Sequence, residues 1–240
     1  MKQENWYDVD TARGGDFSLS NAFPILMRKV FVWMTLALAI TGITAYGVAS
    51  SPALVGMIFS SKVMFWGLII AEFGLVMAIS GAINRLSLAT ATLFFILYSV
   101  VNGATLSVIF LAYSTTVIAK TFFITAGTFG AMALVGYTTK TDLTSMGKLL
   151  FMALIGIIIA SVVNIFVGSS GLDLIISYVG VLIFVGLTAY DTQKIKEMCR
   201  MAPDAGESMQ KLALLGSLSL YLDFVNLFLY LLRIFGNNKD

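Results

Sequence analysis

The sequence predicts an all-α, polytopic membrane protein whose chain crosses the bilayer seven times. Of its 240 residues, 58% are hydrophobic and only 12% are charged, and the mean hydropathy is +0.91. A soluble domain carries about 25% charged residues, so lipid rather than water must be the solvent for most of this chain. Three long stretches, 30–61, 86–119 and 149–172, contain no charged residue at all.

Each span is predicted to be a helix, because a helix of about 20 apolar residues crosses the hydrocarbon and satisfies its own backbone groups. The alternating pattern of barrel strands is absent. In order, the predicted spans are 29–49, 63–83, 86–113, 121–138, 149–167, 174–195 and 212–232.

The segments around the spans fit this division. Residues 1–28 are polar and mixed in charge, and they predict a flexible or amphipathic cytoplasmic lead-in to the membrane domain of residues 29–236. A tight turn with Arg85 joins the second and third spans. In the fourth span, Ala126 and Gly130 lie four residues apart, which predicts a close approach of another helix. The longest loop, 196–211, precedes the last span, and a short tail, 237–240, follows it.

Lysine and arginine predict the orientation, because cytoplasmic loops carry an excess of both. With a cytoplasmic N-terminus, 11 of the 15 lie on the inner side and 4 on the outer side. Seven full crossings place the C-terminus outside, whereas a re-entrant last segment would return it to the inside. The inner set is Lys2, Arg13, Arg28, Lys29, Arg85, Lys140, Lys148, Lys194, Lys196, Arg200 and Lys211, and the outer set is Lys62, Lys120, Arg233 and Lys239.

Three of the 13 acidic residues, Glu72, Asp191 and Asp223, lie within predicted spans. A charged group at the bilayer centre costs at least about 2.5 kcal/mol, so each needs a partner, a water-filled cavity or a bound proton. Asp191 lies near the inner end of the sixth span, and Asp223 lies in the first half of the seventh. If these consecutive spans pack antiparallel, both carboxyl groups lie in the inner half of the membrane.

A close pair of aspartates would let this chain respond to pH without histidine, of which it has none. Two nearby carboxylates resist ionising together and titrate as a unit. Protonated, they can share a hydrogen bond; ionised, they repel each other and attract a cation. Calcium takes about 6–8 oxygen ligands, and two carboxylates supply at most four. A calcium site here would therefore be weak and transient, as suits a permeating ion, and no resident cofactor is predicted.

Purely structural roles stay open for all five charged candidates. Asp191 can neutralise the lysine three residues later at a helix end, and Asp223 can bond an arginine or a hydroxyl group to fix helix packing. Glu72 is either a gate in an ion path or a buried acid paired with Arg233. Arg85 is either a positive-inside anchor or a latch that reaches the aspartate pair from the cytoplasmic side.

Two segments are distinctive: GLTAYDTQKIK at 186–196, and SLYLDFVNLFLYLLRIFG, which ends at Gly236. Together with residues 129–166, they make the chain resemble the transmembrane Bax inhibitor motif family in its bacterial form, from about Phe23 to Gly236. The resemblance implies a seven-helix fold with the last helix central and the six others around it. It also implies a place in the bacterial cytoplasmic (inner) membrane.

The same resemblance implies a pH-sensitive calcium leak whose sensor is a pair of aspartates on the sixth and seventh helices. By position in the two segments, these are Asp191 and Asp223. Arg85 best matches the family's latch arginine. Glu72 best matches its acidic residue on the second helix, with Arg233 as a candidate partner. The charged C-terminal tail of eukaryotic members has no counterpart in residues 237–240.

Other function classes fit less well. A net charge of +2 without a basic run gives no footprint for nucleic acid. Intramembrane aspartyl proteases also place two aspartates on consecutive helices, but their Gly-x-Gly and Pro-Ala-Leu signatures are absent, so no enzymatic activity is predicted. The last span has no lysine for the Schiff base of a light sensor. The alternative is a scaffold that regulates other membrane proteins without transport. The expected partners are calcium ions, the lipid bilayer and membrane proteins.

Overall fold

The structure, a computed structural model, describes the backbone of residues 6–236 and the side chains of residues 22–236. Within that range the chain is all-α, as predicted, and contains no strand. The helices of residues 6–236 are α1 (Trp6–Ala49), α2 (Pro52–Ser60), α3 (Lys62–Ala82), α4 (Leu88–Leu106), α5 (Val108–Ala112), α6 (Thr115–Thr138), α7 (Thr144–Val167), α8 (Ser170–Arg200) and α9 (Glu207–Gly236).

Seven helical segments in the described chain are long and apolar enough to cross a membrane, which confirms the predicted number of spans. They are α1 from Ala22 onward, α4 continued by α5, and the single helices α3, α6, α7, α8 and α9. α4 and α5 form one span because the helix is interrupted only at Ser107, whose hydroxyl donates to the carbonyl oxygen of Ala104 at 2.7 Å.

After α5, all four helices extend beyond their predicted bounds. α6 begins at Thr115 instead of residue 121, α7 begins at Thr144 instead of residue 149, and α8 and α9 are longer than predicted at both ends. Hydropathy marks only the part of a helix that lies in hydrocarbon, whereas charged side chains continue the helix into water. Glu197 near the end of α8, for example, pairs with Lys196 at 3.6 Å and with Arg200 at 3.5 Å.

The start of the chain also differs from the prediction. α2 is an additional helix of nine residues, started by Pro52 at its first position and by Ser51, whose hydroxyl accepts the N–H of Leu54 at 3.5 Å. α1 is helical from Trp6 and continues through Pro24, so it includes most of the predicted lead-in of residues 1–28. The first five residues, and the side chains up to residue 21, lie outside the described part of the chain.

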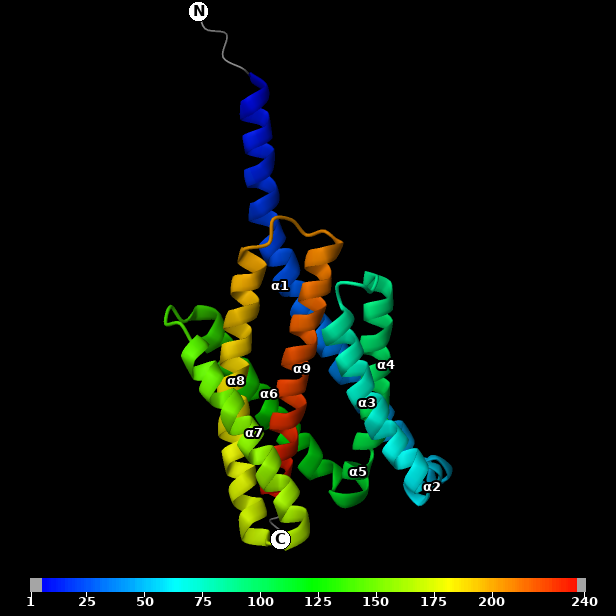
Figure 1. Cartoon of the computed structure of the whole chain (residues 1–240). Coiled ribbons are helices and arrows are strands. Elements are labelled where there is room, and N and C mark those ends of the chain that lie inside the picture. Colours follow the sequence, from blue (N-terminus) through cyan, green and yellow to red (C-terminus); the bar gives the residue numbers. More distant parts are fainter. Residues whose placement is uncertain (1–5, 237–240) are drawn as a thin grey trace, which may run out of the picture.

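The last helix lies at the centre of the bundle, as predicted, but only four other spans pack closely against it. α9 contacts α1, α4, α6 and α8, whereas α3 packs mainly on α4 and α2, and α7 mainly on α8. Figure 1 shows α9 between α7 and α8 on one side and α3 and α4 on the other. Of the most apolar stretch of α9, 67% is buried, against 6% in α3 and in α7. α3 and α7 therefore face lipid along most of their length.

α9 can be central because apolar side chains surround it in its middle. Neighbouring residues such as Leu220 and Tyr221, or Leu227 and Phe228, are all buried although each points about 100° away from the next. The whole circumference of the helix is thus covered at this depth, except where it faces the cavity described below.

Close helix contacts occur at other small residues than those predicted. Gly130 on α6 has no atom within 4 Å of the position where a Cβ would lie, so it mediates no close approach. Gly136, on the same helix, does: a Cβ placed on it would overlap the backbone of Ala189 on α8. The four-residue spacing of Ala126 and Gly130 did not predict the close contact correctly, because spacing does not say which face of a helix meets a neighbour.

α9 crosses the whole bundle, so the re-entrant alternative is wrong. It starts next to the end of α8, after the loop 201–206, and its last turn meets the first turn of α8, where Arg233 lies 3.3 Å from Asp173. A helix of 30 residues is about 45 Å long, more than the hydrocarbon thickness of about 30 Å. In Figure 1, loop 201–206 and the α3–α4 turn lie at one end of the bundle, called the loop end, and the end of α9 lies at the other, called the far end.

Candidate functional site

The two aspartates lie on neighbouring antiparallel helices, as predicted, with Asp191 on α8 and Asp223 on α9. Glycines allow the two helices to approach on both sides of these acids. A Cβ on Gly180 of α8 would lie 2.7 Å from the ring of Tyr230, and a Cβ on Gly216 of α9 would lie 3.0 Å from an isoleucine side chain of α8. Side chains of one helix thus pack directly on the backbone of the other, which holds the two carboxyl groups at a fixed relative position.

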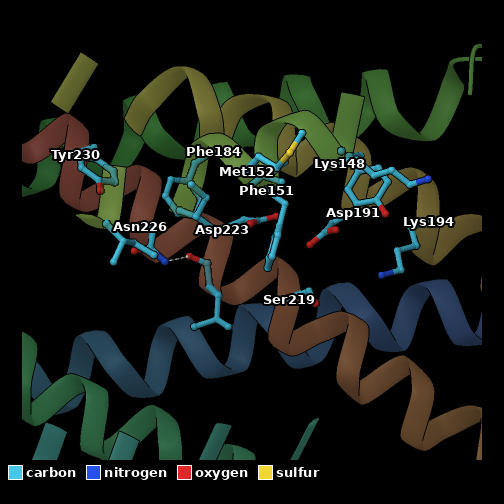
Figure 2. A pocket seen from close by; sticks show the side chains of 16 residues that line it. Lys148, Phe151, Met152, Phe184, Asp191, Lys194, Ser219, Asp223, Asn226 and Tyr230 are labelled. Atoms are coloured by element: carbon cyan, nitrogen blue, oxygen red, sulfur yellow. Dashed lines mark hydrogen bonds between the residues drawn. The ribbon is translucent and has the colours of Figure 1, made fainter. Parts of the chain in front are cut away.

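Both carboxyl groups face one cavity of about 850 Å³ between α7, α8 and α9. Figure 2 shows Asp191 and Asp223 on its wall, together with Phe151 of α7 and Phe184 of α8. One water molecule occupies about 30 Å³, so a cavity of this size with several polar groups has room for a water cluster. The other polar or charged side chains that line it are Lys148, Tyr190, Lys194, Ser219, Asn226 and Tyr230.

Asp223 is the more buried acid, with 5% of its surface exposed, and its Oδ2 has no hydrogen-bond partner among the described residues. No described lysine or arginine lies within 4.0 Å of it. The arginine or hydroxyl partner of the structural alternative is therefore not seen. A carboxylate without a partner is costly inside a membrane, so Asp223 must take a proton, a water molecule or a cation from the cavity.

Asp191 is half-buried and lies between two cavities. A second cavity of about 300 Å³ shares Asp191, Lys194, Ser219 and Leu222 with the first and also touches Ser80 of α3, towards the loop end. The ammonium of Lys194 lies 5.9 Å from the ring centroid of Tyr190, and no ion pair within 4.0 Å joins it to Asp191 in the described chain. The two adjoining cavities extend from the aspartates towards the loop end.

Towards the far end, the large cavity is bounded by Tyr230. The guanidinium carbon of Arg233 lies 5.6 Å from the centroid of the Tyr230 ring, and its Nη1 lies 3.3 Å from Oδ1 of Asp173. The predicted pairing of Arg233 with Glu72 is therefore wrong. Arg233 is in the last turn of α9, which the antiparallel arrangement places beside the first turn of α8, whereas Glu72 lies in the middle of α3 behind α4.

Arg85 is exposed in the turn between α3 and α4, and no described carboxylate pairs with it. Side chains of α9 hold this turn. The ammonium of Lys211 donates to the carbonyl oxygen of Leu86 at 3.0 Å, and a carboxylate oxygen of Glu207 accepts the N–H of Leu88 at 3.0 Å. Arg85 makes no latch contact with the aspartate pair in this structure, and its latch role stays a prediction.

Comparison with known proteins identifies the family. A family model described as inhibitor of apoptosis-promoting Bax1 matches residues 24–240. The chain belongs to the Bax inhibitor family. This agrees with the resemblance carried by the two segments around Asp191 and Asp223.

Bacterial relatives match nearly the whole chain. Inner membrane protein YbhL of Escherichia coli K12 is 50% identical over 214 residues, which is 89% of this chain and 92% of that protein. A protein of Borreliella burgdorferi is 51% identical over 214 residues, with the same coverage. Protein RP147 of Rickettsia prowazekii is 44% identical over 216 residues, 89% of this chain and 90% of that protein. With its seven spans, the chain is a multi-pass membrane protein of the Bax inhibitor family.

Two residues at the cavity of this Bax inhibitor family member were missed from the sequence. Lys148 counted only towards orientation, because the fifth span was predicted to begin after it, whereas α7 begins earlier and turns Lys148 to the cavity. The position of Tyr230 could have been predicted from helical spacing. It follows Asp223 by seven residues, Ser219 precedes Asp223 by four and Asn226 follows it by three, so all lie on one face of the helix. No group of three or more Asp, Glu, His or Cys that could hold a metal occurs in the described chain.

Proposed function

We propose that this protein is a pH-sensitive cation leak of a bacterial inner membrane, with calcium as the permeating ion. The observation that carries the proposal is the placement of Asp191 and Asp223 on the wall of one cavity between α7, α8 and α9, with one oxygen of Asp223 unpartnered among the described residues. Such a site can exchange protons and bind a cation loosely. The proposal requires no chemical reaction and no resident cofactor.

The protonation of the pair would control the leak. With both carboxyl groups protonated, the site is neutral and does not attract a cation. When protons leave, the two carboxylates repel each other and draw a cation into the cavity. Two carboxylates, the amide oxygen of Asn226 and water can complete only a weak calcium site, and a weak site releases the ion again.

The cavities support a route from the loop end to the centre of the bundle. They adjoin at Asp191, Tyr230 bounds the large cavity towards the far end, and the ion pair of Arg233 with Asp173 lies beside Tyr230. In this proposal, the leak needs Tyr230 and this ion pair to move. We place the loop end in the cytoplasm, because Lys29, whose ammonium donates to Gln210 at 2.6 Å, and most other predicted inner lysines and arginines lie there. The inner membrane assignment follows the printed name of the relative YbhL.

The test is calcium influx into liposomes that contain the purified full-length protein and an indicator. Wild type is compared at about pH 6 and about pH 8 with Asp191→Asn combined with Asp223→Asn. Glu197→Gln is the matched control, because Glu197 is also on α8 but pairs with Lys196 and Arg200 outside the cavity.

We expect a pH-dependent flux in wild type and in Glu197→Gln, and no pH dependence in the double variant. If the double variant keeps the wild-type pH dependence, the aspartates are not the sensor. If wild type leaks no faster than empty liposomes at either pH, the channel proposal fails, and a scaffold that regulates other membrane proteins becomes the better explanation.

A further inference from the structure

A third carboxyl group lies within the membrane, on the other side of α9 from the aspartate cavity. Glu72 is at the middle of α3, and its Oε2 accepts a hydrogen bond from Nδ2 of Asn102 on α4 at 3.4 Å. Its Oε1 is buried and has no hydrogen-bond partner among the described residues. Within that part of the chain, no lysine or arginine lies within 4.0 Å of Glu72.

Asn102 connects Glu72 to a chain of buried polar groups on three further helices. The hydroxyl of Tyr221 on α9 donates to Oδ1 of Asn102 at 2.9 Å and lies 2.7 Å from Oγ1 of Thr41 on α1. Thr41 in turn donates to the backbone oxygen of Ser99 on α4 at 3.0 Å. Asn102, Tyr221, Thr41 and Ser99 are all buried, so water cannot complete missing hydrogen bonds at the centre of this chain.

The hydrogens in this chain do not balance when the Asn102 amide donates to Glu72. Three contacts join Tyr221 to Asn102, Tyr221 to Thr41, and Thr41 to Ser99, and only the two hydroxyl groups are available to supply hydrogens for them. One contact of 3.0 Å or less between two oxygens is then left without a hydrogen.

The balance is restored when the Asn102 amide is turned round, since its oxygen and nitrogen are nearly the same in shape. The amide then donates to Tyr221, Tyr221 donates to Thr41, and Thr41 donates to Ser99. The amide oxygen of Asn102 now faces Oε2 of Glu72, and these two oxygens need a hydrogen between them. A protonated Glu72 supplies it, after a small rotation that shortens the 3.4 Å separation.

The surroundings of Glu72 favour the same neutral form. Tyr98 of α4 and Tyr221 of α9 are titratable groups close to Glu72, and neither offers a positive charge. Thr105 of α4 also lies beside the carboxyl group, but its hydroxyl donates to the backbone oxygen of Val101 at 3.3 Å. α2, which also packs on α3, has no titratable side chain. An ionised carboxylate at this depth would cost at least about 2.5 kcal/mol on insertion scales, and a bound proton removes that cost.

We propose that Glu72 is a second proton-binding site, which holds a proton at neutral pH and donates it to the amide oxygen of Asn102. The resulting chain, from Glu72 through Asn102 and Tyr221 to Thr41, ties the outer helix α3 to α9 and α1. Loss of the proton removes one hydrogen from the chain: either no hydrogen is left between Glu72 and Asn102, or the amide turns back and one contact among Tyr221, Thr41 and Ser99 loses its hydrogen. Because Ser80 of α3 lines the smaller cavity, the first outcome would release α3 and widen the route to Asp191, a consequence that rests on the proposed function, whereas the proton site does not.

Infrared spectroscopy of the full-length protein in lipid vesicles tests the site directly, through the carbonyl stretching band of a protonated carboxylic acid. Asp191→Asn with Asp223→Asn serves as the background, so that Glu72 is the acid that remains at mid-membrane depth. An ordinary carboxyl group has a pKa of about 4 and is ionised at about pH 7. We expect a protonated-carboxyl band at about pH 7 that disappears with Glu72→Gln and persists with Glu197→Gln.

Tyr221→Phe in the same background tests the chain without removing the acid. It leaves the Asn102 amide free to turn back, so the band should persist but shift in frequency. If no band at about pH 7 depends on Glu72, the residue is ionised and the proposal is wrong. If the band depends on Glu72 but does not shift with Tyr221→Phe, the chain to α9 is wrong. Neither result depends on whether the protein leaks calcium, so it is separate from the test of the proposed function.

Discussion

Gly136→Ala should loosen the contact between α6 and α8 and thereby disturb the aspartate site. The added Cβ would overlap the carbonyl oxygen of Ala189 and lie 2.8 and 2.9 Å from its carbonyl carbon and Cα, where ordinary contacts begin at 3.4 Å. All three atoms belong to the backbone, so no side-chain rotation relieves the overlap. The two helices must separate by roughly 1 Å, which forfeits up to about half of the dispersion energy of the contacts there.

Overpacking of this kind typically costs about 1–3 kcal/mol. The assay is reversible unfolding in mixed detergent micelles, followed by the fluorescence of the three tryptophans. Gly130→Ala on the same helix is the matched control, because a Cβ there meets no atom within 4 Å and should leave stability unchanged or slightly raised. We expect the free energies of unfolding of the two variants to differ by at least about 1 kcal/mol. Equal stabilities would refute the close contact.

Three other predictions follow from named contacts. Tyr221→Phe should lower the free energy of unfolding by about 1–2 kcal/mol, because it loses hydrogen bonds at 2.9 and 2.7 Å. The control is Tyr98→Phe, which should lower it less in the same micelle assay, because the Tyr98 hydroxyl has no hydrogen-bond partner in the described chain. Arg233→Gln should change stability by less than about 1 kcal/mol, since its ion pair is partly exposed, yet raise calcium flux into liposomes if this pair closes the far end; unchanged flux would contradict that closure. The hydrogen bonds from the side chain and backbone N–H of Thr144 hold the pKa of Asp142 below its ordinary value. Their stabilisation of the start of α7 is therefore present above about pH 4 and lost as the pH falls further; amide exchange there should quicken below that pH in wild type, but Asp142→Ala should show fast exchange at every pH.

The spans were predictable because the bilayer imposes a simple rule on the sequence. A crossing segment must be apolar and about 20 residues long, and the charge-free stretches show such segments directly. α2 was missed because a nine-residue apolar helix and an apolar loop have the same hydropathy. The ends of α8 were missed because ion pairs such as Lys196 with Glu197 extend a helix into water, where hydropathy carries no information.

The partners of the charged residues were harder to predict than the spans. Asp191 and Asp223 could be placed together because a loop of moderate length makes consecutive spans antiparallel. Glu72 and Arg233 could not be placed, because a hydropathy pattern fixes neither the rotation of a helix nor its neighbours across the bundle. The structure gives Arg233 to Asp173 and places Glu72 beside Asn102. In both contacts the two residues lie far apart in the sequence, so no short-range spacing could predict that they meet.

α9 connects the two carboxyl sites, and this connection can be measured. Tyr221 and Asp223 are two residues apart, so their side chains point about 200° apart, one towards Asn102 and the other into the aspartate cavity. A change that shifts α9 at one site must therefore move it at the other. Independent sites would give additive changes in unfolding free energy within about 0.5 kcal/mol.

We expect Glu72→Gln and Asp223→Asn together to depart from additivity by more than that. Asp142→Asn replaces Glu72→Gln in the control pair. Asp142 is exposed in the loop before α7, and α7 packs mainly on α8 rather than on α9. If the first pair is as additive as the control pair, α9 does not transmit between the sites. The two proton-binding groups would then act separately, although they share the same helix.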